Sequence, residues 1–263
     1  MLGNWDFTLK KYERLCKTIA NSRYANITFS DYFQQYPQGD SESFVIMRHD
    51  IDRTPKRALD VARVEHEHNI AATYYFRMRK GTYITDIIDK IASYGHDIGY
   101  HYETLDKAKG DIELAIKLFE RELAEFRKRY LVKTICAHGN PLTSYDNKDI
   151  WKRFNLSDFG LLGEPYLSLD YNKFAYFSES GRTWRNSKAQ KMEGKDYIST
   201  PFSVVEPRDT DELIEIIKEG TLPNICILTH PERWSKDVPS FISRWLLDFA
   251  FTGGKMAIYI YRR

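Results

Sequence analysis

Several features that would point to particular protein classes are scarce in this 263-residue sequence. It has three cysteines, Cys16, Cys136 and Cys226, and their odd number and wide spacing predict free thiols in a reducing compartment rather than disulfides. No apolar run approaches the roughly 18 residues that a membrane-spanning helix needs, so we expect no transmembrane segment. The first residues also lack the basic-then-apolar order of a secretory signal. We therefore expect a cytoplasmic protein.

A strong excess of one charge is missing as well, because 39 Lys and Arg face 37 Asp and Glu, a formal net charge of +2. A protein that binds nucleic acid or an anionic membrane would carry a concentrated positive excess, so we expect neither partner. With 42% hydrophobic and 29% charged residues, the chain has the composition of a globular protein with a large core. We predict an N-terminal helical extension over residues 1–40 and one main domain over residues 41–263.

Short apolar runs alternate with amphipathic stretches along the main domain. Runs rich in β-branched and aromatic residues predict buried strands at residues 44–50, 71–77, 132–138, 225–230 and 256–261. Helical spacing and helix-start signals predict helices at residues 55–68, 83–93, 111–130, 209–218 and 234–251. Residues 157–200 are predicted as irregular β structure or long loops. The alternation favours an α/β fold with a mainly parallel sheet and helices outside it.

Three of the predicted strands run directly into polar turns. The first ends in Arg48-His-Asp-Ile-Asp-Arg53, another in His138-Gly-Asn-Pro141, and a third in His230-Pro-Glu-Arg-Trp234. A further segment is predicted as a short strand that ends near His101. Because the carboxyl ends of parallel strands meet at one edge of a sheet, we expect these side chains to share a site.

The pair Asp50 and Asp52 indicates what that site does. Two residues apart on an extended strand, their carboxylates share a face, and a divalent cation relieves their mutual repulsion. Asp and His ligands that leave one position open are typical of catalytic zinc, which activates water and polarises a carbonyl. Each signal also has a simpler explanation, a turn or helix cap for the aspartates and a hydrogen-bonded surface residue for each histidine. Their coincidence at several strand ends favours the metal site.

At these residues the chain resembles the polysaccharide deacetylases of carbohydrate esterase family 4, the NodB-homology superfamily. It is most similar to a divergent branch whose first motif is His-Asp-x-Asp. Four segments match the family in order, and they are Phe44-Val-Ile-Met-Arg-His-Asp-Ile-Asp52, Asn69-Ile-Ala-Ala-Thr-Tyr-Tyr-Phe76, Gly95-His-Asp-Ile-Gly-Tyr-His101 and Leu228-Thr-His230. The resemblance implies a distorted (β/α) barrel of about seven parallel strands. It also implies a metal-dependent hydrolase, most simply with Zn²⁺, that removes acetyl groups from N-acetylated sugars.

Carried over residue by residue, the resemblance assigns four roles. Asp50 matches the catalytic base, Asp52 the metal-binding aspartate, His101 the first metal histidine and His230 the late catalytic histidine. The family usually has a second metal histidine four positions after the first, where this chain has Leu105. We predict that His138 completes the site, because it ends a neighbouring strand. Three less favoured candidates for that ligand are Glu103, His49 and His96.

The substrate is the least specified part of the prediction. Trp184 is a candidate for stacking on a sugar ring, and Arg182 for holding a phosphate or carboxylate, although a tryptophan that packs a loop onto the barrel is an equal alternative. The lack of an export signal favours a nucleotide-linked or lipid-linked glycan precursor in surface-glycan synthesis of the O-antigen or capsule type. Two other functions stay open, an amidohydrolase acting on another small amide and a catalytically silent protein that binds glycan or a partner.

Overall fold

A computed structural model of the chain describes residues 5–35, 43–140, 143–179, 181–184, 198–243 and 246. Its centre is a seven-stranded sheet of order β5-β4-β3-β2-β7-β6, with β1 pairing to β2 outside this path. Each of these strand pairs is parallel. The strands are β1 (Ala25–Ile27), β2 (Phe44–Ile51), β3 (Thr73–Phe76), β4 (Asp97–Tyr102), β5 (Ile135–Ala137), β6 (Phe174–Ser178) and β7 (Asn224–Thr229).

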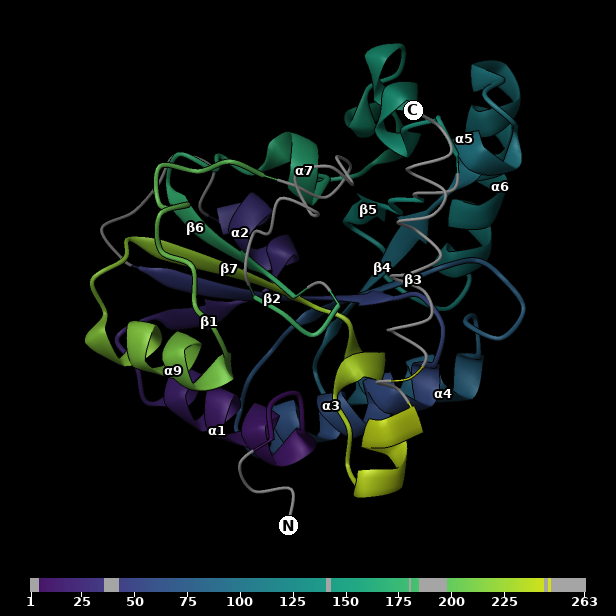
Figure 1. Ribbon diagram of the computed structural model, residues 1–263. Coiled ribbons are helices and arrows are strands. Elements are labelled where there is room, and N and C mark those ends of the chain that lie inside the picture. The colour runs from purple at the N-terminus through teal and green to yellow at the C-terminus, as the bar shows by residue number, and fades with distance from the viewer. Residues whose placement is uncertain are drawn as a thin grey trace.

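Helices connect these strands and lie on both faces of the sheet. The α-helices are α1 (Leu9–Ala20), α2 (Phe29–Gln35), α3 (Pro55–Glu67), α4 (Thr85–Ser93), α5 (Thr104–Lys107), α6 (Ile112–Arg127), α7 (Pro165–Ser168) and α9 (Thr210–Glu219). Three 3-10 turns are η1 (Asn147–Lys152), η2 (Leu156–Phe159) and η3 (Pro231–Arg233). Figure 1 shows α1, α3, α4 and α9 along one face, with α2 and α7 on the opposite, inner face. The sheet curls into a half-barrel with flanking helices, which confirms the predicted distorted (β/α) barrel.

The position of β2 between two layers of helices explains why both its apolar and its polar residues are buried. All eight residues of β2 are buried. Val45, Met47 and Ile51 belong to the core shared with the outer helices, whereas Ile46 belongs to the inner core with Phe29 of α2. Because successive side chains of a strand point to opposite faces, a strand covered on both sides has no solvent-facing position. The same alternation places Arg48 and Asp50 on the inner face.

Residues 5–35, predicted as part of an extension, are built into the same cores as the strands. The buried residues Tyr12, Leu15 and Ile19 of α1 belong to the outer core. Strand β1 pairs with the first residues of β2, and β3 pairs with the later ones. The structure thus gives this segment one strand of the sheet and helices on both of its faces.

The predicted strands and helices are largely present, with three differences. The segment predicted as irregular contains β6, which is buried over its whole length and pairs with β7. The helix predicted to begin at Trp234 instead begins at residue 238, because Trp234 is fully buried against Phe7 and Tyr12. The strand predicted at residues 256–261 lies outside the described residues.

One glycine is required by the packing of the inner face. A Cβ atom on Gly99 of β4 would lie 2.3 Å from the ring of Tyr75, a distance far below van der Waals contact. The absence of a side chain therefore lets the Tyr75 ring lie across the neighbouring strand. The hydroxyl of Tyr75 reaches Thr134 at 3.0 Å, just before β5.

None of the three cysteines forms a disulfide, as predicted, and all three are buried. Cys16 lies in α1, Cys136 in β5 and Cys226 in β7, and each side chain is fully excluded from solvent. Within the described part of the chain, no helix combines the length and the apolar character that a membrane crossing requires.

Candidate metal centre

The carboxyl ends of β2, β4, β5 and β7 bring the predicted site residues to one edge of the half-barrel. The strand register pairs His101 of β4 with Cys136 of β5. His138 directly follows β5, two residues after Cys136, and therefore points to the same face of the sheet as Cys136. Asp50 is near the end of β2, Asp52 directly follows that strand, and His230 directly follows β7. Parallel pairing therefore accounts for the convergence of segments that are far apart in sequence.

Asp52, His101 and His138 form a group that can hold a metal ion. One oxygen of Asp52, Oδ1, lies 3.6 Å from Nε2 of His101 and 3.4 Å from Nε2 of His138. The three potential ligand atoms all lie within 4.8 Å of one another. Ligand atoms about 2.1 Å from a tetrahedral zinc ion lie roughly 3.4 Å apart, so these spacings suit such an ion. Asp52 Oδ1 is also buried without a hydrogen-bond partner among the described residues, as expected of an oxygen that faces a cation.

His101 is oriented by a backbone contact. Its Nδ1 lies 3.0 Å from the carbonyl oxygen of Cys136, which can only accept, so the proton is on Nδ1 and Nε2 points toward the carboxylates. Burial by itself lowers the pKa of His101, but the carboxylates of Asp50 and Asp52 outweigh it and raise that pKa above its usual value. Nε2 thus lies in a negative environment that suits a cation.

His138 is held by its own backbone. Its N–H donates to Tyr102 at 2.8 Å, and its carbonyl accepts from the side chain of Asn147 at 2.9 Å. Burial, together with the nearby charges of His101 and Arg77, lowers the pKa of His138 to about 4. The imidazole is therefore neutral near pH 7, the form in which histidine binds metals.

Asp50 lies beside this group and is fixed by an arginine of its own strand. Arg48 donates to both oxygens of Asp50, through Nε at 2.9 Å and Nη2 at 2.7 Å, and also donates to the hydroxyl of Tyr166 at 2.9 Å. Burial raises the pKa of Asp50, but the Arg48 guanidinium brings it below its usual value. Sequence reasoning missed Arg48, although its position two residues before Asp50 on the same strand face was a usable signal.

His230 is held by a buried glutamate that no sequence pattern singled out. Its Nδ1 lies 3.1 Å from the carbonyl oxygen of Glu179 and 3.3 Å from that residue's carboxylate. Arg233 also binds the Glu179 carboxylate, at 2.7 Å. Burial and Arg233 lower the pKa of His230, but the carboxylates of Glu179 and Asp52 prevail and raise it to about 9. A histidine with that pKa carries a proton near neutral pH.

A second possible ligand group consists of Asp50, His101 and Cys136. It shares His101 with the first, so one ion would occupy one place or the other. Asp50 is already bound by both arms of Arg48. Asp52 Oδ1 accepts no hydrogen bond among the described residues, although the Arg77 guanidinium lies 3.9 Å away, and its group is therefore the better fit for a divalent ion.

The other predicted candidates lie elsewhere or play other parts. His49 is on the outer face of β2, where Nε2 lies 2.7 Å from Glu65 and Nδ1 lies 2.7 Å from Thr229. His96 accepts from the N–H of Ala72 and donates to the carbonyl of Ala62. Both histidines thus belong to the packing between the sheet and α3. Leu105, at the family's second-histidine position, is buried in the outer core.

The two predicted sugar-binding residues have different surroundings. The side chain of Trp184 is only 2% exposed, its indole N–H donates to Thr210, and its ring packs against Phe7 and Trp234. The ring is part of the core, which favours the alternative of a tryptophan that packs a loop onto the barrel, and its contact with a sugar stays a prediction. Arg182 donates its backbone N–H to Glu179, and its guanidinium lies over the ring of Phe241. Its contact with substrate stays a prediction.

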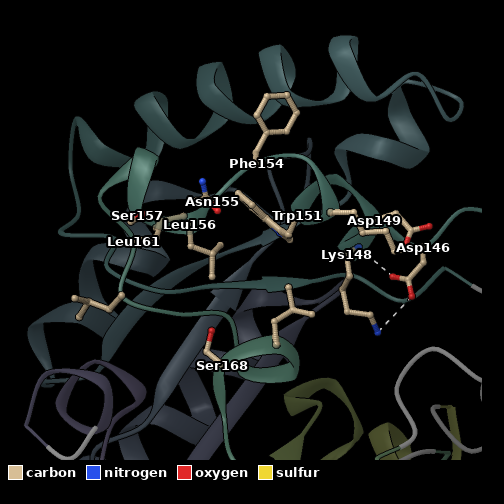
Figure 2. A pocket seen from close by; sticks show the side chains of 13 residues that line it. Asp146, Lys148, Asp149, Trp151, Phe154, Asn155, Leu156, Ser157, Leu161 and Ser168 are labelled. Carbon is tan, nitrogen blue, oxygen red and sulfur yellow. Dashed lines mark hydrogen bonds and ion pairs between the residues drawn. The ribbon is translucent and has the colours of Figure 1, made fainter.

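A hollow of about 680 Å³ lies between η1, η2 and α7, and Figure 2 shows Trp151, Asn155 and Ser168 around it. None of its lining residues is a predicted site residue. The hollow nevertheless adjoins residues that support the site. Asn147, next to Lys148 of its wall, binds the His138 carbonyl, and Tyr166, next to Leu167, accepts from Arg48.

Comparison with known proteins adds no family assignment. The chain matches no protein-family model, and a search of curated proteins finds no match.

Proposed function

We propose that the protein is a metal-dependent hydrolase that removes an N-acetyl group from a sugar or sugar precursor. The observation that carries this proposal is the convergence of Asp52, His101 and His138 within 4.8 Å of one another. The motifs shared with polysaccharide deacetylases support the reaction type. Zn²⁺ is the proposed ion, because two histidines and one carboxylate that leave a position open are a typical catalytic zinc set.

Each residue around the proposed ion has a chemical task. When bound, the ion supplies the Lewis acidity that polarises the acetamide carbonyl. Asp50, ionised and held by Arg48, takes a proton from the attacking water. His230, protonated near neutral pH, gives a proton to the departing amine. It lies close enough to Asp50 and Asp52 for its charge to lower the pKa of both carboxyls.

The first test measures metal content and then acetate release. Purified protein is expected to contain about one zinc ion per chain and to release acetate from N-acetylated sugar nucleotides or oligosaccharides. A protein that binds no divalent metal would contradict the proposal and favour a glycan- or partner-binding function. A protein that binds metal but releases no acetate from any sugar would favour an amidohydrolase with another small amide as substrate.

Two substitutions separate metal binding from proton transfer. Asp50→Asn is expected to abolish turnover while zinc content stays near wild type, because both oxygens of Asp50 are bound by Arg48 and Asp50 is not one of the three proposed ligands. His138→Ala is expected to lose most of the bound zinc. The exposed His66 of α3 provides a matched control, and His66→Ala is expected to change neither quantity. Normal zinc content in His138→Ala would remove that residue from the ligand set.

A further inference from the structure

The carboxylate of Glu103 lies behind His138, on the side away from Asp52. Glu103 follows β4 directly and is only 7% exposed. Its Oε2 lies 3.7 Å from Nδ1 of His138. The opposite ring nitrogen, Nε2, lies 3.4 Å from Asp52 Oδ1. The imidazole therefore stands between two carboxylates, and each of its nitrogens faces one of them.

An imidazole that binds a metal ion carries a single proton, and the nitrogen that holds this proton decides whether His138 can bind an ion. Nδ1 is buried without a hydrogen-bond partner among the described residues, and the nearby acceptor is Glu103. A proton on Nε2 would leave the Nδ1 lone pair facing a carboxylate and would leave no lone pair for the ion. A proton on Nδ1 points an N–H at Glu103 and leaves the Nε2 lone pair on the side of Asp52.

Arg77 keeps Glu103 in place and charged. Its Nη2 donates to Oε2 of Glu103, and its Nη1 donates to the backbone carbonyl of Asp52 at 3.4 Å. Lys107 adds a second positive charge, 3.6 Å from the other Glu103 oxygen. The Arg77–Glu103 pair thus contacts or faces two of the three proposed ligands.

We infer that Glu103 is a positioning residue that selects the metal-binding tautomer of His138, with Arg77 holding it in place. This inference rests on the metal site of the proposed function. A carboxylate behind a ligand histidine fixes the orientation of the ring and increases its basicity toward the ion. Glu103 was considered above as a direct ligand, and the geometry gives it this supporting task instead.

The first test compares the zinc affinity of two variants of the protein, in each of which one buried glutamate is replaced by glutamine. Glu103→Gln keeps the size of the side chain and removes its charge, and it is expected to weaken zinc binding by about tenfold or more in a competition with a chromophoric chelator. Glu122→Gln is the matched control. Glu122 lies on α6, is 8% exposed and also binds Lys107. It accepts a hydrogen bond from the hydroxyl of Tyr100. An equal loss of affinity in both variants would overturn the inference.

The second test observes the tautomer directly. In the zinc-free wild-type protein, long-range ¹H–¹⁵N correlation is expected to show the proton of His138 on Nδ1, and in Glu103→Gln a larger share on Nε2. A wild-type ring protonated on Nε2 would overturn the inference, even if the variant fails to fold. A protein that binds no zinc at all would instead contradict the proposed function, while the tautomer would still decide the part that Glu103 plays.

Discussion

The reacting groups of the candidate site depend on partners that oppose the effect of burial. Burial raises the pKa of Asp50 and lowers that of His230, so burial without charged partners would favour the neutral form of both groups. Ion pairs reverse these effects: Arg48 pairs with Asp50 at 2.7 Å, and Glu179 pairs with His230 at 3.3 Å. The result is a proton acceptor and a proton donor that coexist near neutral pH.

The Glu179–His230 pair gives a pH-dependent prediction. With a pKa of about 9, His230 is protonated below that pH and loses its proton as the pH rises through it. NMR titration of the His230 side chain is therefore expected to give a value near 9, and the rate of acetate release should fall on the alkaline side near that pH. In Glu179→Gln both should move down by more than about one pH unit, because burial and Arg233 then prevail.

The control for this titration is Glu67→Gln, which alters an exposed carboxylate of α3. This variant is expected to leave the His230 titration as it is in the wild-type protein. A variant that loses activity while the His230 titration is unchanged would mean that Glu179 only supports the local structure.

At the residue level, the sequence was most informative where a side chain ends an apolar run. Asp50, Asp52, His101 and His138 could be selected because strand periodicity and parallel pairing bring their positions together. Glu179 could not, since it follows a five-residue strand inside a segment without a clear pattern. Two alternatives stayed open for Trp184, because its sequence neighbours do not reveal that Phe7 and Trp234 pack against its ring.

At the scale of elements, a buried carboxylate links α1 to the sheet. Glu65 of α3 is fully buried, and its Oε1 accepts from the hydroxyl of Tyr12 of α1 at 2.5 Å and lies 2.7 Å from His49 of β2. Its Oε2 accepts from the hydroxyl of Tyr74 of β3 at 2.5 Å. One charge thus joins two helices and two strands behind the candidate site.

Removing one of these hydrogen bonds should destabilise the fold measurably. Tyr12→Phe is expected to lower the free energy of unfolding by about 2 kcal/mol, because a buried carboxylate loses one of its donors. Tyr130→Phe is the matched control, since its hydroxyl donates to Asp89, a half-exposed carboxylate, and should cost less than about 1 kcal/mol. Urea unfolding followed by circular dichroism measures both. Equal losses would show that Glu65 is no anchor for α1.

The helices and strands that could be predicted from the sequence are mainly the long or fully buried ones. Strands β2, β3 and β7 each contain an apolar run and are almost entirely buried, and the stripe of α6 at Ile116, Phe119 and Leu123 is buried as its spacing indicated. Strand β1 has three residues, too few for a period to show. Its pairing with β2 is a tertiary interaction that local pattern cannot reveal.

At the scale of the whole molecule, the proposed ligands tie together distant parts of the chain. Asp52 directly follows β2, His101 lies in β4 and His138 directly follows β5, and the segments between them include α3, α4, α5 and α6. An ion bound to all three is absent from the unfolded state, so its binding free energy adds to the stability of the fold.

Zinc is therefore expected to stabilise the entire protein. At a free zinc concentration about 100 times Kd, the free energy of unfolding should rise by about 2.7 kcal/mol, measured as the difference between zinc and chelator in urea unfolding. Asp52→Asn should lose this increment, whereas Asp86→Asn, which alters an exposed aspartate of α4, should retain it. A zinc increment that survives in Asp52→Asn would place the ion elsewhere.

The three buried thiols can be used to measure local unfolding of the protein. An alkylating reagent reaches a fully enclosed cysteine only when the surrounding structure parts, so each labelling rate reports one local excursion. Cys16 reports on the N-terminal helix, Cys226 on a central strand, and Cys136 on the strand between two of the proposed ligand histidines. The native chain thus carries its own probe of local opening next to the candidate metal site, with no engineered label required.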